Sequence, residues 1–277
     1  MEIRPVGGRT TTDLVADKAF ISCSGETPYN KEGLLQGHAI DSALSEAGLQ
    51  QAEAAGRYLK DVRFSRVFVS DMLRAVQTAE SILKHNSSCL GLQMVRDPLL
   101  KEKMSSNLPS FGIAEGRKVK ELKEMAEAAG QTFPGFTPPN GETQEQVKQR
   151  VQEFLEKMLQ QVGSERCRDG GQDGPLETCP VEGKPDNGLR DVPVHVLVVT
   201  HGALMCVAVR YFVEELGCCV PQGCDKAYMF SLSPNTGVCW FILTVKEEQQ
   251  RFVLSGIRCV FVHRFCRNIK YYIVVLL

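Results

Sequence analysis

The stretch that decides the fold is VLVVTHGALMC, at residues 196–206. Its first half is an unbroken apolar run rich in β-branched residues, which is typical of a parallel strand buried on both faces. The run stops at Thr200-His201-Gly202, and the apolar spacing that follows is helical. In an open α/β sheet, ligands bind at the carboxyl ends of the strands. The stretch therefore predicts a strand–turn–helix unit with His201 at the functional edge of a sheet.

Strand and helix signals alternate along the rest of the chain. Short apolar runs predict strands at 18–23, 66–70, 194–200, 227–233 and 237–245. Apolar residues at helical spacing predict helices over 49–62, from about 70 through 83, and over 151–162. Ser45 is the expected N-cap of the first of these helices. The alternation predicts an α/β fold, a three-layer α/β/α sandwich with a mostly parallel central sheet.

The composition is that of an ordinary globular chain, with 277 residues, 43% hydrophobic, 23% charged and a formal net charge of −1. A chain so close to neutral has no broad basic field for nucleic acid or an anionic lipid surface. The eleven cysteines form neither CxxC pairs nor a Cys/His zinc ladder. The start lacks an apolar signal segment, and the final apolar run, 269–277, is too short to span a bilayer. We expect a cytoplasmic protein with reduced thiols and no transmembrane span.

Arg74 is a candidate anion ligand on positional grounds. It lies about one turn into the helix that follows the strand 66–70, and Ser70 is the expected cap of that helix. A guanidinium close to a helix N-terminus shares an anion with the backbone N–H groups. For a single arginine, an ordinary surface position is the alternative.

Several segments together resemble the histidine phosphatase superfamily, the phosphoglycerate mutase-like enzymes. They are SDMLRAVQT at 70–78, TPPNGET at 137–143, the Thr-His-Gly step at 200–202 and NTG at 235–237. Within the superfamily, the string from Phe136 to Thr143 is most similar to fructose-2,6-bisphosphatases. The resemblance implies a metal-free and cofactor-free phosphatase with a phosphohistidine intermediate. It implies a small phosphorylated metabolite as substrate, fructose 2,6-bisphosphate or 2,3-bisphosphoglycerate.

The resemblance also implies roles for individual residues. His201 is the second pocket histidine, Arg74 is a phosphate ligand, and Glu102 is the acid that protonates the leaving oxygen. Glu142 is expected in the first turn of a helix near the pocket. The remaining substrate-binding candidates are Glu26, Thr27, Asn30, Gln36, Gly37 and Gly202.

The nucleophile position departs from the family pattern. The family opens with Arg-His-Gly-Glu-Thr, whose His attacks phosphorus, whereas this chain reads Cys23-Ser24-Gly25-Glu26-Thr27. A thiolate mechanism at Cys23 would need an arginine six residues on, and that position is Tyr29. We therefore expect a structural thiol and hydroxyl here, and weak or absent turnover. A phosphate-binding pseudophosphatase or scaffold protein is the alternative function, and a phosphoglycerate mutase is a third.

Departures from the family pattern at both ends define the expected domain limits, and two more stretches stand out within the domain. Residues 1–24 are an atypical segment that replaces the family's first strand and nucleophile, 25–265 form the phosphatase domain, and 266–277 are an atypical apolar tail. Within the domain, the Gly-, Pro- and charge-rich stretch 163–193 is expected to be a flexible insertion without helix or strand. Seven additional residues at 104–110 follow Glu102 closely. They leave a solvent-exposed Glu102 as the alternative to a positioned acid.

Overall fold

The computed structural model describes residues 15–37, 39–89, 91–102, 115–131, 136–169 and 194–265, with backbone only for 15, 16 and 165–169. Its centre is a six-stranded sheet in the order β3-β2-β4-β1-β5-β6. The strands are β1 (Val15–Cys23), β2 (Arg66–Val69), β3 (Met94–Arg96), β4 (His195–Thr200), β5 (Val238–Glu248) and β6 (Arg251–Arg264). The pairings β1–β4, β4–β2 and β2–β3 are parallel, and β5 and β6 add two antiparallel pairings.

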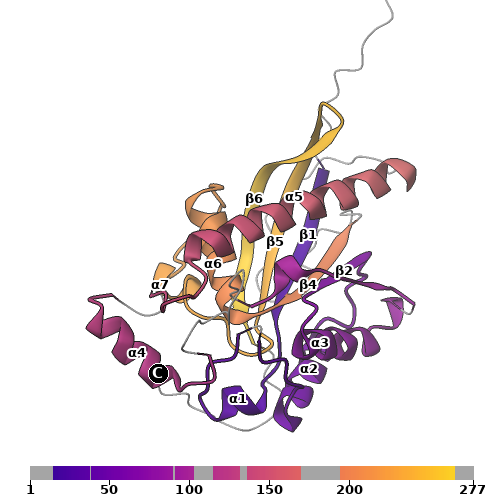
Figure 1. Ribbon diagram of the computed structural model, residues 1–277. Coiled ribbons are helices and arrows are strands. Elements are labelled where there is room, and N and C mark those ends of the chain that lie inside the picture. Colours follow the sequence, from indigo (N-terminus) through magenta and orange to yellow (C-terminus); the bar gives the residue numbers. More distant parts are fainter. Residues whose placement is uncertain are drawn as a thin grey trace, which may run out of the picture.

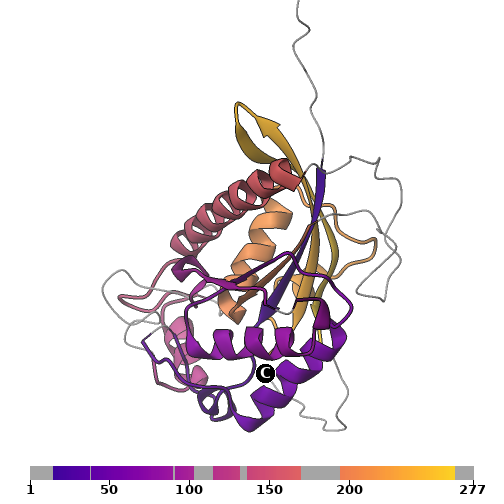
Figure 2. The same ribbon diagram turned by 90° about the vertical axis from the view of Figure 1, so that its right-hand side faces the viewer.

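Helices cover both faces of this sheet (Figures 1 and 2). They are α1 (Pro28–Lys31), α2 (Glu46–Tyr58), α3 (Leu73–Lys84), α4 (Val119–Ala128), α5 (Gln144–Asp169), α6 (Gly202–Glu214) and α7 (Lys226–Met229). Two 3-10 turns lie at Ser87–Cys89 and Pro98–Leu100. The predicted α/β fold with helices on both faces of a central sheet is confirmed.

Strand β1 shows how one short sequence joins both halves of the core. Side chains alternate between the two faces of a strand, and Phe20 packs with α2 and α3 while Ala19 and Cys23 pack with α5 and α6. β1 lies between β4 and β5, with Phe20 opposite Leu197 on one side and Trp240 on the other. Residues 15–23 are thus a central strand of the sheet, longer by three residues than the stretch 18–23 predicted from its apolar run.

Around β5, one sequence prediction was wrong and one strand was missed. The segment 227–233 was expected to be a strand, but Lys226–Met229 forms the short helix α7, because the Asp225 carboxylate accepts a hydrogen bond of 2.8 Å from the N–H of Ala227. The long strand β6 was not predicted. Its hydrogen bonds come from β5, from which it is separated only by a tight turn at Gln249 and Gln250, both with positive φ.

The stretch 163–193 was expected to carry no helix, and this is wrong for its first seven residues, because α5 runs on to Asp169. The extension packs on β6. A side chain at Gly163 would lie 2.1 Å from the ring of Phe252, so the missing side chain makes room for that ring. Gln160 reinforces the contact with hydrogen bonds to both backbone groups of Phe252. The rest of the stretch, 170–193, and the expected tail 266–277 lie outside the described residues.

Candidate functional site

The site lies at the carboxyl ends of the two central parallel strands. Ser24 follows β1 and His201 follows β4, with 6% and 1% of their surfaces exposed. The N–H of Ser24 donates to the carbonyl of Thr200 at 2.8 Å, and its own carbonyl accepts from the N–H of Thr236 at 3.1 Å. The backbone at position 24 is thus fixed from both sides, independently of its side chain.

His201 is held by one ring nitrogen. Its Nε2 lies 2.9 Å from the hydroxyl of Ser70, while Nδ1 is buried without a hydrogen-bond partner among the described residues. Burial, and then the positive charges of Arg74 and Arg150, keep the pKa of His201 well below its usual value of 6.5. At neutral pH the ring is therefore an uncharged imidazole, which exchanges protons without first losing one.

The sequence predicted that Ser70 caps α3, and this prediction is wrong. The N-cap is Met72, whose side chain makes no capping bond, and the carboxylate of Asp41 accepts from the N–H of Leu73 at 2.7 Å instead. Because β2 ends at Val69, the Ser70 side chain is directed to the neighbouring strand end and meets His201.

Arg74 is 3% exposed on α3, so the surface alternative is wrong. Its two terminal nitrogens donate to the carbonyls of Gly37 and Ile40, each at 3.2 Å. These bonds use two of the five N–H groups of a guanidinium. Burial lowers the Arg74 pKa, and the nearby carboxylates of Glu102 and Asp41 oppose that shift. Arg74 thus brings positive charge to the site and ties down the loop 36–42.

Glu102 is also buried, at 8% exposed, so the alternative of an exposed acid is wrong. Its carboxylate accepts from the N–H groups of Ala203 and Leu204, in the first turn of α6, at 3.4 and 3.3 Å. Gly202 is the first residue of that helix, between His201 and these N–H groups. The additional residues 104–110 lie outside the described residues.

The substrate-binding candidates between residues 26 and 36 are joined mainly to one another and to nearby residues by hydrogen bonds. Thr27 caps α1, its N–H bonds to the amide oxygen of Asn30, and its hydroxyl donates to Gln36 at 2.7 Å. Asn30 is exposed, and Gln36 continues the network to the hydroxyl of Ser42 at 2.6 Å. Glu26 accepts from Ser45, the N-cap of α2, at 2.8 Å. That N-cap was predicted correctly.

Glu115 was missed from the sequence, although it holds this loop. One of its carboxylate oxygens accepts from the N–H groups of Gly37, Ala39 and Ile40, at 3.1, 3.0 and 3.1 Å. Successive backbone N–H groups form a concave nest that attracts anions. Gly37 is therefore fixed at its N–H by Glu115 and at its carbonyl by Arg74.

Glu142 lies just before α5 and not in its first turn, which corrects the prediction. Thr143 caps the helix, in a reciprocal pair of hydrogen bonds with Gln146. Glu142 forms a bidentate ion pair with Arg150, at 2.8 Å for both contacts. No sequence signal marked Arg150, because its partners lie eight or about fifty residues away.

Cys23 is not a thiolate nucleophile. Burial, and then the negative charge of Glu102, raise the pKa of the Cys23 thiol to about 12. At neutral pH the thiol stays protonated, and only the thiolate is nucleophilic. The structural thiol expected from the sequence agrees with this environment.

Within the described part of the chain, no group of three or more His, Cys, Asp or Glu side chains is placed to hold a metal ion. Among the same residues, no helix is both long and apolar enough to cross a membrane. The arrangement combines a neutral imidazole, a guanidinium and a carboxyl group around two strand ends. These are the groups that bind a phosphoryl oxygen and protonate a leaving alcohol.

Comparisons with known proteins agree on the family and the kind of fold. Residues 20–167 match the model of the histidine phosphatase superfamily (branch 1). The chain is 52% identical to the probable fructose-2,6-bisphosphatase TIGAR A of Danio rerio over 244 residues, 87% of this chain and 93% of that protein. It is 40% identical to the fructose-2,6-bisphosphatase TIGAR of Xenopus tropicalis, with 89% and 93% covered.

Solved structures show the same fold at lower identity. A phosphoglycerate mutase from Bacillus anthracis superimposes with a TM-score of 0.60 at 23% identity, covering 88% of this chain and 93% of that one. A protein described as mycobacterial hydrolase 2 gives a TM-score of 0.62 at 20% identity, covering 92% and 94%. These two likenesses concern the fold alone.

Proposed function

Because the chain belongs to the histidine phosphatase superfamily, we propose that its site is that of a fructose-2,6-bisphosphatase whose turnover is weak or absent, since Ser24 occupies the nucleophile position. The observation that carries the proposal is the convergence of His201, Arg74 and Glu102, all buried, on the ends of β1 and β4. Relatives that share up to 52% of their residues with this chain are described as fructose-2,6-bisphosphatases, which supports a sugar bisphosphate as substrate.

In the reaction that we propose for this kind of site, an imidazole at position 24 forms a bond to phosphorus while the bond between phosphorus and the sugar oxygen breaks. The sugar oxygen leaves with the proton of Glu102, which enters this step in its protonated form, and water then releases the phosphate from the imidazole. Arg74 has N–H groups left for the phosphoryl oxygens after its two loop contacts. The uncharged His201 has a buried Nδ1 available for another phosphoryl oxygen. When the imidazole that should attack is replaced by a serine hydroxyl, the phosphoryl acceptor is missing. Removing a nucleophile typically lowers turnover by about six orders of magnitude.

A phosphate-binding protein without turnover is the second candidate, and one observation favours it. The Cys23 thiol at the end of β1 has its pKa raised to about 12, so it stays protonated at neutral pH. The Ser24 side chain, which is 6% exposed, contacts that thiol. Both candidate functions predict binding of sugar bisphosphates. They differ only in whether the bound phosphate ester is hydrolysed.

We also propose a cytoplasmic location. The eight cysteines whose side chains the structure describes are free thiols, which suits a reducing compartment.

Turnover of fructose 2,6-bisphosphate and 2,3-bisphosphoglycerate tests the proposal. The chain is compared with the double variant Cys23→Arg, Ser24→His, and binding of inorganic phosphate is measured for both. We expect phosphate binding by both proteins, and turnover at least about a thousandfold faster in the variant. Binding by both without turnover in either favours the phosphate-binding protein. If neither protein binds phosphate, the proposed site is wrong.

A further inference from the structure

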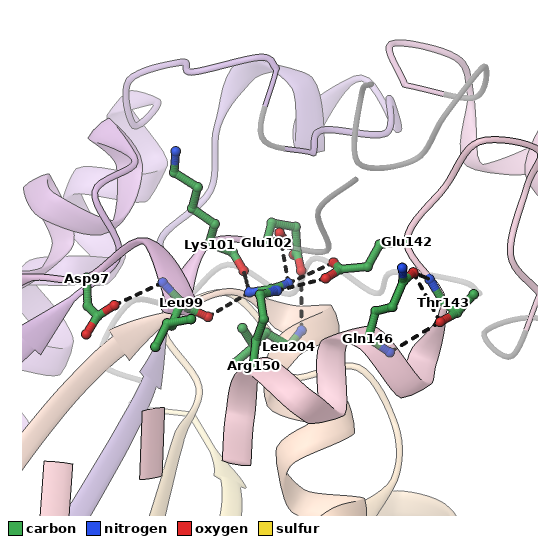
Figure 3. Close-up of polar contacts among 9 residues, drawn as sticks. All are labelled: Asp97, Leu99, Lys101, Glu102, Glu142, Thr143, Gln146, Arg150 and Leu204. Carbon is green, nitrogen blue, oxygen red and sulfur yellow. Dashed lines mark hydrogen bonds and ion pairs between the residues drawn. The ribbon is translucent and has the colours of Figure 1, made fainter. Parts of the chain in front are cut away.

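Arg150 has every donor engaged within the protein, as Figure 3 shows. Its Nε and Nη2 bind the two carboxylate oxygens of Glu142. Its Nη1 donates to the carbonyls of Leu99 at 2.6 Å and Lys101 at 3.1 Å, and Nη2 also reaches the carbonyl of Glu102 at 3.5 Å. A guanidinium has five N–H groups. Here four of them make contacts of 2.6–3.1 Å, and the fifth makes the longer and weaker contact at 3.5 Å. Arg150 therefore bonds mainly to the protein.

The ion pair that anchors Arg150 is almost fully removed from solvent. The exposed fractions of the two side chains are 11% for Arg150 and 6% for Glu142. A bidentate Arg–carboxylate pair fixes both distance and orientation, and it is stronger where water is excluded. The ion pair therefore fixes the position of the Arg150 guanidinium, which in turn holds the carbonyls of residues 99, 101 and 102 by hydrogen bonds.

A second contact ties the same segment to α5. Lys157 lies about two turns beyond Arg150 on the helix, and its Nζ binds Asp97 at 2.7 Å. The other Asp97 oxygen accepts from the N–H of Leu99 at 3.0 Å. The segment 97–102 is thus fastened to one helix at two points, and Glu102 is at its end.

The side chain of Glu102 accepts two hydrogen bonds from α6 that are 3.3 and 3.4 Å long, beyond the usual 2.7–3.2 Å for N–H···O bonds. The position of its carboxyl group therefore also depends on the backbone that carries it, and Arg150 holds that backbone. An acid displaced by about 1 Å loses about a hundredfold in rate.

We propose that Arg150, anchored by Glu142, is a positioning residue that fixes Glu102 for proton donation to the leaving oxygen. This inference rests on the proposed phosphatase function. It assigns to Arg150 its main effect on one chemical step, the protonation of the leaving group. The charge of Arg150 also acts on the buried ring of His201, but it does so for every phosphate substrate alike.

The test uses this selectivity, in the variant that carries Cys23→Arg and Ser24→His. An alkoxide leaving from a sugar phosphate needs a proton, whereas the p-nitrophenolate that leaves from p-nitrophenyl phosphate does not. Arg150→Met should lower kcat on fructose 2,6-bisphosphate about a hundredfold and kcat on p-nitrophenyl phosphate by less than about threefold. Equal losses on both substrates would overturn the proposal.

Two further variants sharpen the result. Glu142→Gln keeps the shape of the anchor but removes its charge, so it should give the same selective pattern with a smaller loss. Adding Arg150→Met to Glu102→Gln should cause no further loss on the sugar phosphate, because both act through the same proton. Arg57→Met, which removes an exposed pair with Glu53, is the matched control and should leave both rates unchanged. Additive losses in the double variant would contradict a role through Glu102.

If the doubly substituted chain shows no turnover at all, the proposed function fails but the positioning role is still measurable in the chain with Cys23 and Ser24. Arg150→Met should speed hydrogen exchange at the N–H groups of Ala203 and Leu204, which bind Glu102, and leave that of Val209 in the middle of α6 unchanged. Unchanged exchange at Ala203 and Leu204 would show that Arg150 does not position Glu102. Faster exchange along the whole helix would show a general structural role and would also overturn the proposal.

Discussion

The site has two halves, one at the end of β4 and the start of α6 and one at the end of β1, and they differ in which of the side chains expected in the family they carry. On the side of β4 and α6, Glu102 and His201 are buried, and Glu102 is held by a clamp anchored in α5. At the end of β1, the backbone of Ser24 is held by Thr200 and Thr236, and the pKa of the neighbouring Cys23 thiol is raised to about 12. The comparison teaches that backbone contacts fix the two strand ends, while the chemistry of the site depends on side chains that those contacts do not constrain.

The largest effect on turnover is expected from His201, at the end of β4. In the chain with Cys23→Arg and Ser24→His, His201→Gln should lower kcat by about 10²- to 10³-fold, because a preorganised donor to the phosphoryl group is lost. Steady-state kinetics on fructose 2,6-bisphosphate check this. A loss below about threefold would mean that His201 does not take part in the reaction.

The next largest effect, a loss of stability, is expected where Glu26 packs against Gly48 on α2. A side chain at Gly48 would lie 2.1 Å from the carbonyl oxygen of Glu26, so Gly48→Ala must push Glu26 away from α2. We expect a loss of about 2–3 kcal/mol in the free energy of unfolding, measured with urea. The control is Gly256→Ala on β6, where the nearest atoms are 3.6 Å away. Equal stability of the two variants would show that the end of β1 is not rigidly packed.

Acid should weaken the protein through His201. Its pKa in the folded protein lies well below 6.5, so the unfolded chain binds a proton that the folded one does not. Stability is therefore fully present above pH 6.5 and falls as the pH drops below it, by about 1.4 kcal/mol per pH unit until the folded pKa is reached. Urea unfolding at pH 7 and pH 5.5 measures the difference.

In His201→Gln this part of the acid sensitivity should disappear. The contribution of His263, whose pKa burial also lowers, should remain. An unchanged pH dependence would mean that His201 is not buried as an uncharged ring.

The smallest effect on the free energy of unfolding is expected at the ion pair between Lys157 on α5 and Asp97. Lys157→Met leaves the carboxylate of Asp97, whose side chain is 1% exposed, without its cation, but the lysine is itself 45% exposed. Solvent screening at the lysine keeps the loss of unfolding free energy at about 1 kcal/mol. The matched variant Lys120→Met removes an exposed pair with Glu124 and should be neutral. If the two variants are equally stable, α5 does not hold the segment through Asp97.

The sequence revealed what is encoded over a few neighbouring residues. His201 was predicted because a buried strand, a Thr-His-Gly step and a helix follow one another directly, and Ser45 because an N-cap acts three residues away. Arg74 was found from its place near a helix start, although the cap of that helix comes from Asp41, in a separate loop.

What the sequence did not reveal depends on contacts between distant segments. Arg150 binds carbonyls about fifty residues away, and Glu115 binds N–H groups more than seventy residues away, so neither has a local signal. The short apolar run at 227–233 fits strand or helix equally, and the side chain of Asp225 decides for the helix. The burial of Glu102 likewise follows from α5 and α6 and not from its neighbours in the chain.

The most direct test of the account is to trap the phosphorylated protein by rapid quenching and mass spectrometry after mixing with fructose 2,6-bisphosphate. We predict no phosphoenzyme for the chain with Cys23 and Ser24, and an acid-labile phosphoryl group at position 24 when Cys23→Arg and Ser24→His are introduced. A phosphoenzyme formed by the chain without these substitutions would contradict the account, because it would show that Ser24 or another residue of the site acts as a nucleophile.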